Sequence, residues 1–233
     1  AASLRAAFAV PRDGVARAGR VGRALVLAAR AAGVRVREGV DVRAVARGAG
    51  RVTGVETSVG FLPSEVVVLA GAAGPDGVEG APRLSLEPTS RPWLRLEAGS
   101  DPDRPGRLLV SREVSLVPRR DGTLLVLGRG SREAVPAGPS AGSVAELLSS
   151  VARMVPAAPG WVLRDLGAGV DFAAPDGVPV LGEAGEGGLL VAAGWGGDDL
   201  LFCPAAAALL ADLVMGRTPP LGASPFSPGR IGV

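Results

Sequence analysis

The stretch that decides the fold is GLLVAAGWGGDDLLFCPAAAALLADLVMG, residues 188–216. An apolar run of strand length ends at Ala193, a glycine-rich turn follows over 194–197, and an apolar helix is predicted to begin at Asp199. A glycine turn before a helix exposes backbone N–H groups, whose partial positive charge favours an anionic ligand. Asp198 and Asp199 carry negative charge at that helix start and would repel such a ligand.

The residues before this stretch predict an α/β layer. Residues 15–32 show apolar positions at helical spacing with arginines on the other face, and Gly33 is a natural helix end. Short strands are predicted over 34–37, 40–45, 52–55 and 65–70, the last of them fully apolar. A helix followed by short strands and one buried strand indicates an α/β layer with an attached β-meander.

From about residue 84 the pattern changes to extended segments with period-two stretches. Asp121-Gly122 predicts a hairpin turn. Ser143 and Glu146 form a capping box that predicts the start of a helix, which Pro156 ends. The predicted fold class is therefore mixed α/β, in which residues 1–80 and 175–233 form one domain and residues 81–174 form a second, antiparallel domain.

Composition limits the chemistry open to the chain. Its 233 residues include no His, Lys, Tyr, Asn or Gln. Imidazole–nucleophile pairs, histidine metal sites and lysine Schiff bases are therefore excluded, and no metal site is expected. Any general base must be Asp or Glu, or the chemistry must belong to a cofactor. The single cysteine, Cys203 in LLFCPAA, is interpreted as a small buried packing residue.

Charge and hydropathy argue against two classes of partner. The chain has 25 basic and 23 acidic residues, and its scattered arginines with three Trp and five Phe predict no nucleic-acid surface. No apolar run reaches the roughly 18 residues that indicate a membrane span. The N-terminus shows no secretory leader, so a cytoplasmic location is expected.

Eight stretches, in this order, resemble the FAD-dependent D-amino-acid oxidase family, and most closely its glycine oxidase branch linked to thiamine biosynthesis. They are RALVLAARAAGVRVREGVDVRAV, RVTGVETS, EVVVLAGAAG, VSLVPRRDGTLLVLG, AGSVAELLSSVARMVP, APDGVPVLG, GLLVAAGWGGDDLLFCPAAAALLADLVMGRTPP and FSPGR. The resemblance implies FAD as cofactor, a partial FAD-binding Rossmann-type layer built from both chain ends, and an antiparallel substrate domain between them.

The resemblance also implies cofactor-binding positions. These are Val42, Ala70, Gly71, Gly194, Gly196, Gly197, Asp198 and Leu200. In the family, the main chain at the first position meets the adenine, and the strand ending at the next two passes beside the flavin. The glycine turn and helix start face the flavin pyrimidine and stabilise the negative charge of the reduced ring. A plain core valine and an ordinary buried strand are the alternatives for the first three positions.

The implied substrate positions are both substituted. Ser115 stands where the family has a tyrosine, and Asp171 stands where it has the arginine that clamps the substrate carboxylate. An aspartate there would repel a carboxylate. Arg95, Arg112 or Arg119 could supply another clamp, or each could be a solvated strand charge.

Two interpretations of the acidic pair stay open. In the structural one, Asp198 caps the helix and Asp199 lies in its first turn. In the functional one, the pair marks a site that no longer has to stabilise a negatively charged flavin. Asp176-Gly177, in contrast, is interpreted as a structural turn.

The chain contains no G-x-G-x-x-G turn, the family's pyrophosphate-binding motif, because GAGRVTG has the wrong spacing. The resemblance is expected to start well inside the family's chain. We therefore expect an FAD-dependent oxidase of glycine, or of another small amino acid or amine, that has little or no activity alone. The alternatives are a non-catalytic relic or binding protein on this scaffold, and one half of a split oxidase whose partner chain carries the missing motif.

Overall fold

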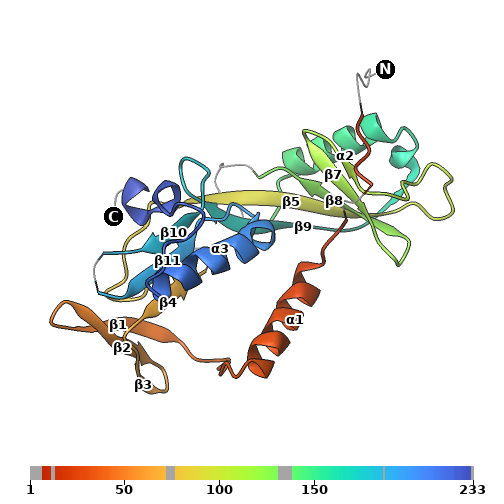
Figure 1. Ribbon diagram of the computed structural model, residues 1–233. Coiled ribbons are helices and arrows are strands. Elements are labelled where there is room, and N and C mark those ends of the chain that lie inside the picture. The colour runs from red at the N-terminus through yellow and green to blue at the C-terminus, as the bar shows by residue number, and fades with distance from the viewer. Residues whose placement is uncertain (1–6, 12–13, 72–76, 131–137, 186, 232–233) are drawn as a thin grey trace. The chain divides into compact units, whose positions relative to one another are not determined.

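The computed structural model describes residues 7–11, 14–71, 77–130, 138–185 and 187–231 (Figure 1). The chain separates into two compact units. Unit 1 comprises Ala1–Val21 and Ser90–Val170, and unit 2 comprises Gly22–Thr89 and Asp171–Val233. The helices are α1 (Ala18–Ala31), α2 (Ala141–Met154) and α3 (Asp199–Val214), with short 3-10 helices η1 (Ala158–Gly160), η2 (Ser224–Phe226) and η3 (Pro228–Ile231).

Unit 1 is built on a sheet with the strand order β6-β7-β8-β5-β9, in which β6, β7, β8 and β5 pair antiparallel with their neighbours in that order. Its strands are β5 (Glu87–Glu97), β6 (Leu109–Val110), β7 (Val114–Pro118), β8 (Thr123–Gly128) and β9 (Val162–Ala173). The predicted hairpin turn at Asp121-Gly122 is confirmed, because it joins β7 to β8 and Gly122 adopts φ +84°. Cross-strand pairing fixes the register, with Ser115 opposite Leu127 and Leu127 opposite Trp93.

One face of this sheet is covered by α2, as Figure 1 shows. Leu94, Leu116 and Val126 are fully buried and pack in one cluster with Leu147 and Val151 of α2. Alternate residues of the strands point away from the helix, as the period-two pattern requires. Ser115 therefore lies on the opposite face from α2.

The predicted capping box at the start of α2 is wrong. The helix begins three residues earlier, and the N-cap is Ser140, whose Oγ accepts a hydrogen bond from the backbone N–H of Ser143 at 3.1 Å. The hydroxyl of Ser143 donates to the carbonyl of Ser140 at 2.9 Å. Both serines satisfy the sequence rule for a cap, and the earlier one takes the position because the helix extends back to Ala141.

Unit 2 contains two small sheets. The meander β1-β2-β3 is antiparallel, and the second sheet has the order β10-β11-β4. In that second sheet β11 pairs antiparallel with β10 but parallel with β4. The strands are β1 (Val42–Gly48), β2 (Arg51–Thr57), β3 (Gly60–Pro63), β4 (Val67–Ala70), β10 (Val180–Glu183) and β11 (Leu189–Ala193).

The central strand β11 is buried on both faces. Leu189, Val191 and Ala193 pack with Val45 and Val52 of the meander. On the other face, Ala192 packs with Ala206 and Leu209 of α3, which lies beside β10 and β11 in Figure 1. Burial on both faces explains why β11 is apolar without alternation.

Two predictions for unit 2 are corrected. Residues 34–37 form no strand, so the alternation of valine and arginine there is not a strand signal. The strand predicted over 65–70 forms as β4 but is only half-buried, and Val68 is 42% exposed. Within the described residues β4 lies at the edge of its sheet, and that position explains its exposure.

Candidate functional site

The glycine turn connects β11 to α3. Gly194, Gly196 and Gly197 have φ values of +72°, +60° and +87°, which side chains with a Cβ rarely adopt. Gly194 is buried, and a Cβ there would lie 2.9 Å from Cδ2 of Leu86. The turn therefore requires glycine both for its conformation and for its packing.

The end of β4 lies beside the turn. Ala70 pairs with Ala192, and the N–H of Gly71 donates to the carbonyl of Ala192 at 3.2 Å. Because β4 and β11 are parallel, their carboxyl ends meet at one edge of the sheet, where open α/β sheets bind ligands. The structure thus brings Ala70 and Gly71 together with the turn.

Asp171 approaches the same turn through the end of β9. The N–H of Gly196 donates to the carbonyl of Phe172 at 2.9 Å, and Ala173 forms a β-bridge with Trp195. The backbone carbonyl of Asp171 accepts from Oγ1 of Thr89 at 3.3 Å, and its side chain is partly exposed. Asp171 therefore places an acidic side chain directly before Phe172 and Ala173, the end of β9 that contacts the glycine turn.

Two further predicted positions lie elsewhere. Ser115 lies in β7 of unit 1, on a sheet face shared with Trp93 and Arg95. Val42 begins β1 of the meander, pairs with Thr57 and is 39% exposed. The alternative interpretation of Val42 as a buried core residue is therefore wrong. Val42 belongs to the meander rather than to the sheet that contains β4 and β11, and Ser115 belongs to the other unit.

The acidic pair, Asp198 and Asp199, lies at the N-terminal end of α3. Asp198 is the N-cap, with φ −106° and ψ 17°, but its side chain makes no capping hydrogen bond. Its carbonyl accepts from the N–H groups of Leu201 and Phe202 at 3.0 and 3.1 Å. Asp199 follows in the first turn, and Leu200 is partly buried. The structural interpretation correctly predicts that Asp198 occupies the N-cap position. It is wrong that the Asp198 carboxylate caps the helix by a hydrogen bond.

This difference predicts unequal costs for two cap substitutions. Ser140→Ala removes a formed capping bond and should lower the free energy of unfolding by about 1 kcal/mol. Asp198→Ala removes only an exposed charge near a helix end and should cost no more than about 0.5 kcal/mol. Urea denaturation of both variants measures the difference, and equal losses would contradict it.

The alternative arginine clamps have different surroundings. Arg95 pairs with Asp165 at 3.5 Å, and Arg119 lies 4.0 Å from Asp121 at the hairpin turn. Arg112 lines a cavity beside α2, away from the sheet face that carries Ser115. Arg95 shares a sheet face with Ser115, and Arg119 follows Ser115 at an even spacing directly after β7.

Asp176-Gly177 forms the structural turn that the sequence predicts. Oδ1 of Asp176 accepts from the N–H of Val178 at 3.0 Å, and Gly177 has φ +75°. Nε of Arg230 donates to Oδ2 of Asp176 at 2.8 Å. The bond from Arg230, aided by that from Val178, lowers the pKa of Asp176 to about 2. This carboxylate therefore holds η3 in place and is not available as a general base.

Two features escaped prediction from the sequence. Trp93 packs closely against β9, because a Cβ at Gly167 would come within 2.6 Å of its ring. Cys203 is partly exposed rather than buried. Gly-x-Gly in a strand, as at Gly167 and Gly169, was the signal that could have predicted a close aromatic contact.

Within the described part of the chain, no group of three or more His, Cys, Asp or Glu side chains could hold a metal ion. A search of the same residues finds no helix long and apolar enough to cross a membrane.

The chain combines an antiparallel sheet with a parallel strand pair that has a glycine turn and a helix at its carboxyl edge. This combination defines a mixed α/β protein, and such a carboxyl edge is where open α/β sheets bind ligands. Comparison with known families assigns it further. The chain belongs to the DAO family of FAD-dependent oxidoreductases, whose model matches residues 1–213.

Curated relatives support this assignment. The chain is 31% identical over 221 residues to the bifunctional protein ThiO/ThiG of Synechocystis sp., covering 94% of this chain and 34% of that protein. It is 31% identical over 207 residues to a glycine oxidase of Pseudomonas putida, covering 85% of this chain and 55% of that protein. The chain therefore spans only a third to about half of these relatives.

Solved structures agree in fold. The glycine oxidase of Geobacillus kaustophilus superposes with a TM-score of 0.75 at 27% identity, covering 89% of this chain and 56% of that one. The L-proline dehydrogenase of P. horikoshii gives a TM-score of 0.81 at 19% identity, covering 91% and 59%. The predicted family is confirmed, as is the mixed α/β fold class.

Proposed function

We propose that this chain is part of an FAD-dependent oxidase of glycine or of another small amino acid or amine, with little or no activity by itself. The observation that carries the proposal is the glycine turn at the shared carboxyl edge of β4 and β11. Its relatives include proteins named glycine oxidase, to which it is about 30% identical. FAD would supply the oxidation of the amine to an imine, and oxygen would then reoxidise it.

The residues of this edge fit a flat, extended cofactor. Gly194, Gly196 and Gly197 have positive φ values and no side chain, so a cofactor can approach their backbone where a Cβ would block it. Ala70 and Gly71, which are small and exposed, end the neighbouring strand. We assign these five residues, Asp198 and Leu200 as the contacts that would hold part of FAD, with Val42 at the position whose main chain would meet the adenine.

Substrate positioning is where the chain is weakest. Asp171 would face the substrate carboxylate with a like charge, and Ser115 is too short to replace a tyrosine hydroxyl. Asp198 and Asp199 reduce the positive potential at the start of α3. Because no His or Lys is present, the amine must enter in its neutral form unless a carboxylate accepts its proton. These charges favour a second candidate function, a non-catalytic binding protein on the same scaffold.

Exposed surfaces of unit 2 support a further polypeptide segment that covers them, whether it belongs to the same chain or, as in the split-oxidase alternative, to a second one. β4 is an edge strand within the described residues, so its outer backbone groups are open to pairing with a further strand. α1 buries none of its residues, and Leu25 and Leu27 are 55% and 65% exposed. A polypeptide with a strand, a G-x-G-x-x-G turn and a helix would pair with β4 and supply the missing pyrophosphate site.

The purified chain is expected to be colourless. The pyrophosphate turn carries much of the affinity for a dinucleotide, so the edge residues alone should not retain FAD through purification. The absorbance spectrum between about 350 and 500 nm, where a bound flavin absorbs, measures this directly. A yellow protein with stoichiometric FAD would overturn the expectation.

The proposed site is tested by supplying a segment with a strand, a G-x-G-x-x-G turn and a helix, either fused to these residues or as a second chain. Flavin should then bind, and Gly196→Ala should weaken that binding, because it adds a side chain to the turn. Gly216→Ala is the matched control, since Gly216 has a similar φ of +67° after α3 and no atom lies within 4 Å of where its Cβ would be. Flavin binding that is equally sensitive to both variants would count against the proposed site.

A further inference from the structure

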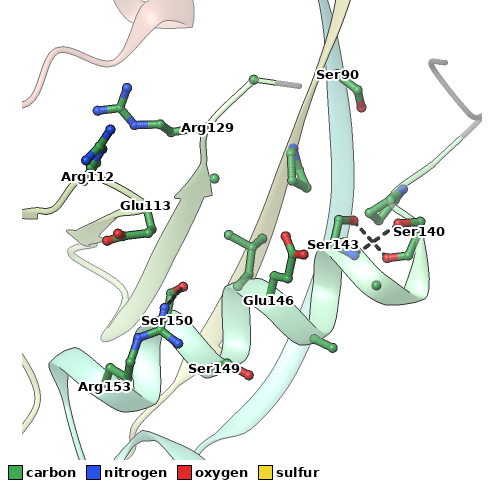
Figure 2. A pocket seen from close by; sticks show the side chains of 17 residues that line it. Ser90, Arg112, Glu113, Arg129, Ser140, Ser143, Glu146, Ser149, Ser150 and Arg153 are labelled. Atoms are coloured by element: carbon green, nitrogen blue, oxygen red, sulfur yellow. Dashed lines mark hydrogen bonds between the residues drawn. The ribbon is translucent and has the colours of Figure 1, made fainter. Parts of the chain in front are cut away.

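A cavity of about 1060 Å³ lies in unit 1, between α2 and the open end of the β7–β8 hairpin (Figure 2). Arg112, Arg129 and Glu113 line it from the hairpin, and Ser143 and Glu146 line it from α2. Of the substrate and cofactor positions named above, only Arg112 belongs to its lining, as an alternative carboxylate clamp that lies away from the sheet face of Ser115. The positions assigned to the proposed oxidase chemistry do not line this cavity.

The topology forces two arginines together. Val114 pairs with Gly128 as the last pair of the hairpin. Arg112 precedes the first of these by two residues, and Arg129 directly follows the second. Both side chains therefore leave the same end of the hairpin, and Figure 2 shows them on the same side of the cavity.

Neither guanidinium is neutralised within the described chain. No hydrogen bond or ion pair to another described residue is made by Arg112 or Arg129. Arg153, the third arginine of the lining, donates to Oγ of Ser150 at 2.8 Å. Two like charges at one hairpin end repel each other, and an anion between them would replace that repulsion with charge-assisted hydrogen bonds.

Among the described residues, the acids of the cavity form no ion pair with these two arginines. Glu113 lies on the same side of the cavity in Figure 2 and keeps its negative charge while it accepts a hydrogen bond from Oγ of Ser111 at 3.3 Å. Glu146 extends from the second turn of α2, towards Ser90 in Figure 2 rather than towards the arginines. The described residues of the lining include three arginines and two glutamates, and Arg112 and Arg129 gather on one side.

The remaining walls are preformed. Gly128 forms part of the floor, where a Cβ would lie 2.9 Å from Cδ2 of Leu147 and 3.0 Å from Cγ of Pro92. Ser140 brings a hydroxyl group to the start of α2, where its oxygen accepts the capping bond, and the first turn of the helix has no acidic residue. A cavity of this size exceeds what a single small ion fills, so it suits an organic anion.

We propose that this cavity binds a multiply charged small anion, whose phosphate or carboxylate oxygens are held by Arg112 and Arg129. The guanidinium fork matches both kinds of oxyanion. Binding would not require FAD, since every contributing residue belongs to unit 1. The proposal thus stands apart from the oxidase function.

The test is a calorimetric titration of the full chain with inorganic pyrophosphate and, separately, with citrate at constant ionic strength. Arg112→Ala and Arg129→Ala should each weaken binding by about tenfold, the loss of one charge-assisted contact. Both residues are exposed, so both variants should fold, which circular dichroism checks. Tighter pyrophosphate binding would identify a phosphate ligand, and tighter citrate binding a carboxylate ligand.

Arg120→Ala is the matched control. Arg120 is exposed at the turn end of the same hairpin, and its loss changes the net charge equally. Binding should be unchanged in this variant. An equal loss of anion affinity in all three variants would show that only general charge attraction is at work and would overturn the proposal. A failure of both anions to bind at millimolar concentration would also overturn it.

Discussion

Replacing Gly188 by alanine is expected to lower the free energy of unfolding of unit 2 by about 3 kcal/mol or more. Gly188 has φ +93°, and a Cβ there would lie 2.2 Å from the backbone carbonyl oxygen of Glu65. Its own carbonyl accepts from the N–H of Val67 at 2.9 Å, at the start of the β11–β4 pair. The obstacle is backbone, which cannot rotate away as a side chain could, so β4 must separate from β11.

The control for this prediction is Gly185→Ala. Gly185 has nearly the same φ, +83°, and lies three residues earlier, but no atom lies within 4 Å of a Cβ placed there. It should therefore cost only the backbone strain, about 1 kcal/mol. Urea denaturation followed by circular dichroism measures both losses of stability. Similar losses in the two variants would show that the close contact at Gly188 contributes nothing to the cost.

Local signals in the sequence predicted local structure well. Asp121-Gly122 specifies a hairpin because its turn chemistry acts over only a few residues. Gly33 ends α1 as expected, with φ +87° and a hydrogen bond from its N–H to the carbonyl of Arg30. Features that depend on residues far away along the chain were harder to predict from the sequence. Whether Val68 is buried depends on what pairs with β4, and its own segment does not contain that information.

The candidate site shows the same division. The glycines at 194, 196 and 197 predict a positive-φ turn, and the structure has it. That Gly71 lies beside this turn follows from the parallel pairing of β4 with β11, two strands that are far apart along the chain. The convergence of Arg112 and Arg129 likewise depends on hairpin register, so the spacing of the two arginines along the chain does not predict it.

The second large effect is expected at Asp171, once the missing segment has been restored and flavin binds. Asp171→Arg should raise kcat/KM for glycine or sarcosine by roughly tenfold to a hundredfold, because a bidentate charge-assisted pair with the substrate carboxylate contributes about 1.5–3 kcal/mol. The position lies next to Phe172, whose carbonyl holds the glycine turn through Gly196. An arginine there would extend from a strand end already fixed against the turn.

Binding of a carboxylate that cannot be oxidised separates positioning from chemistry. Acetate should bind the Asp171→Arg protein more tightly than the unmodified one, as measured by its effect on the flavin absorbance. Asp41→Arg is the control, because Asp41 is exposed before β1 and the substitution changes the net charge equally. If Asp41→Arg gives the same gain, the benefit is long-range attraction, whereas no gain from either variant would mean that Asp171 does not occupy the carboxylate position. A gain confined to Asp171→Arg would show that the loss of one arginine, rather than of the scaffold, limits substrate binding by this chain.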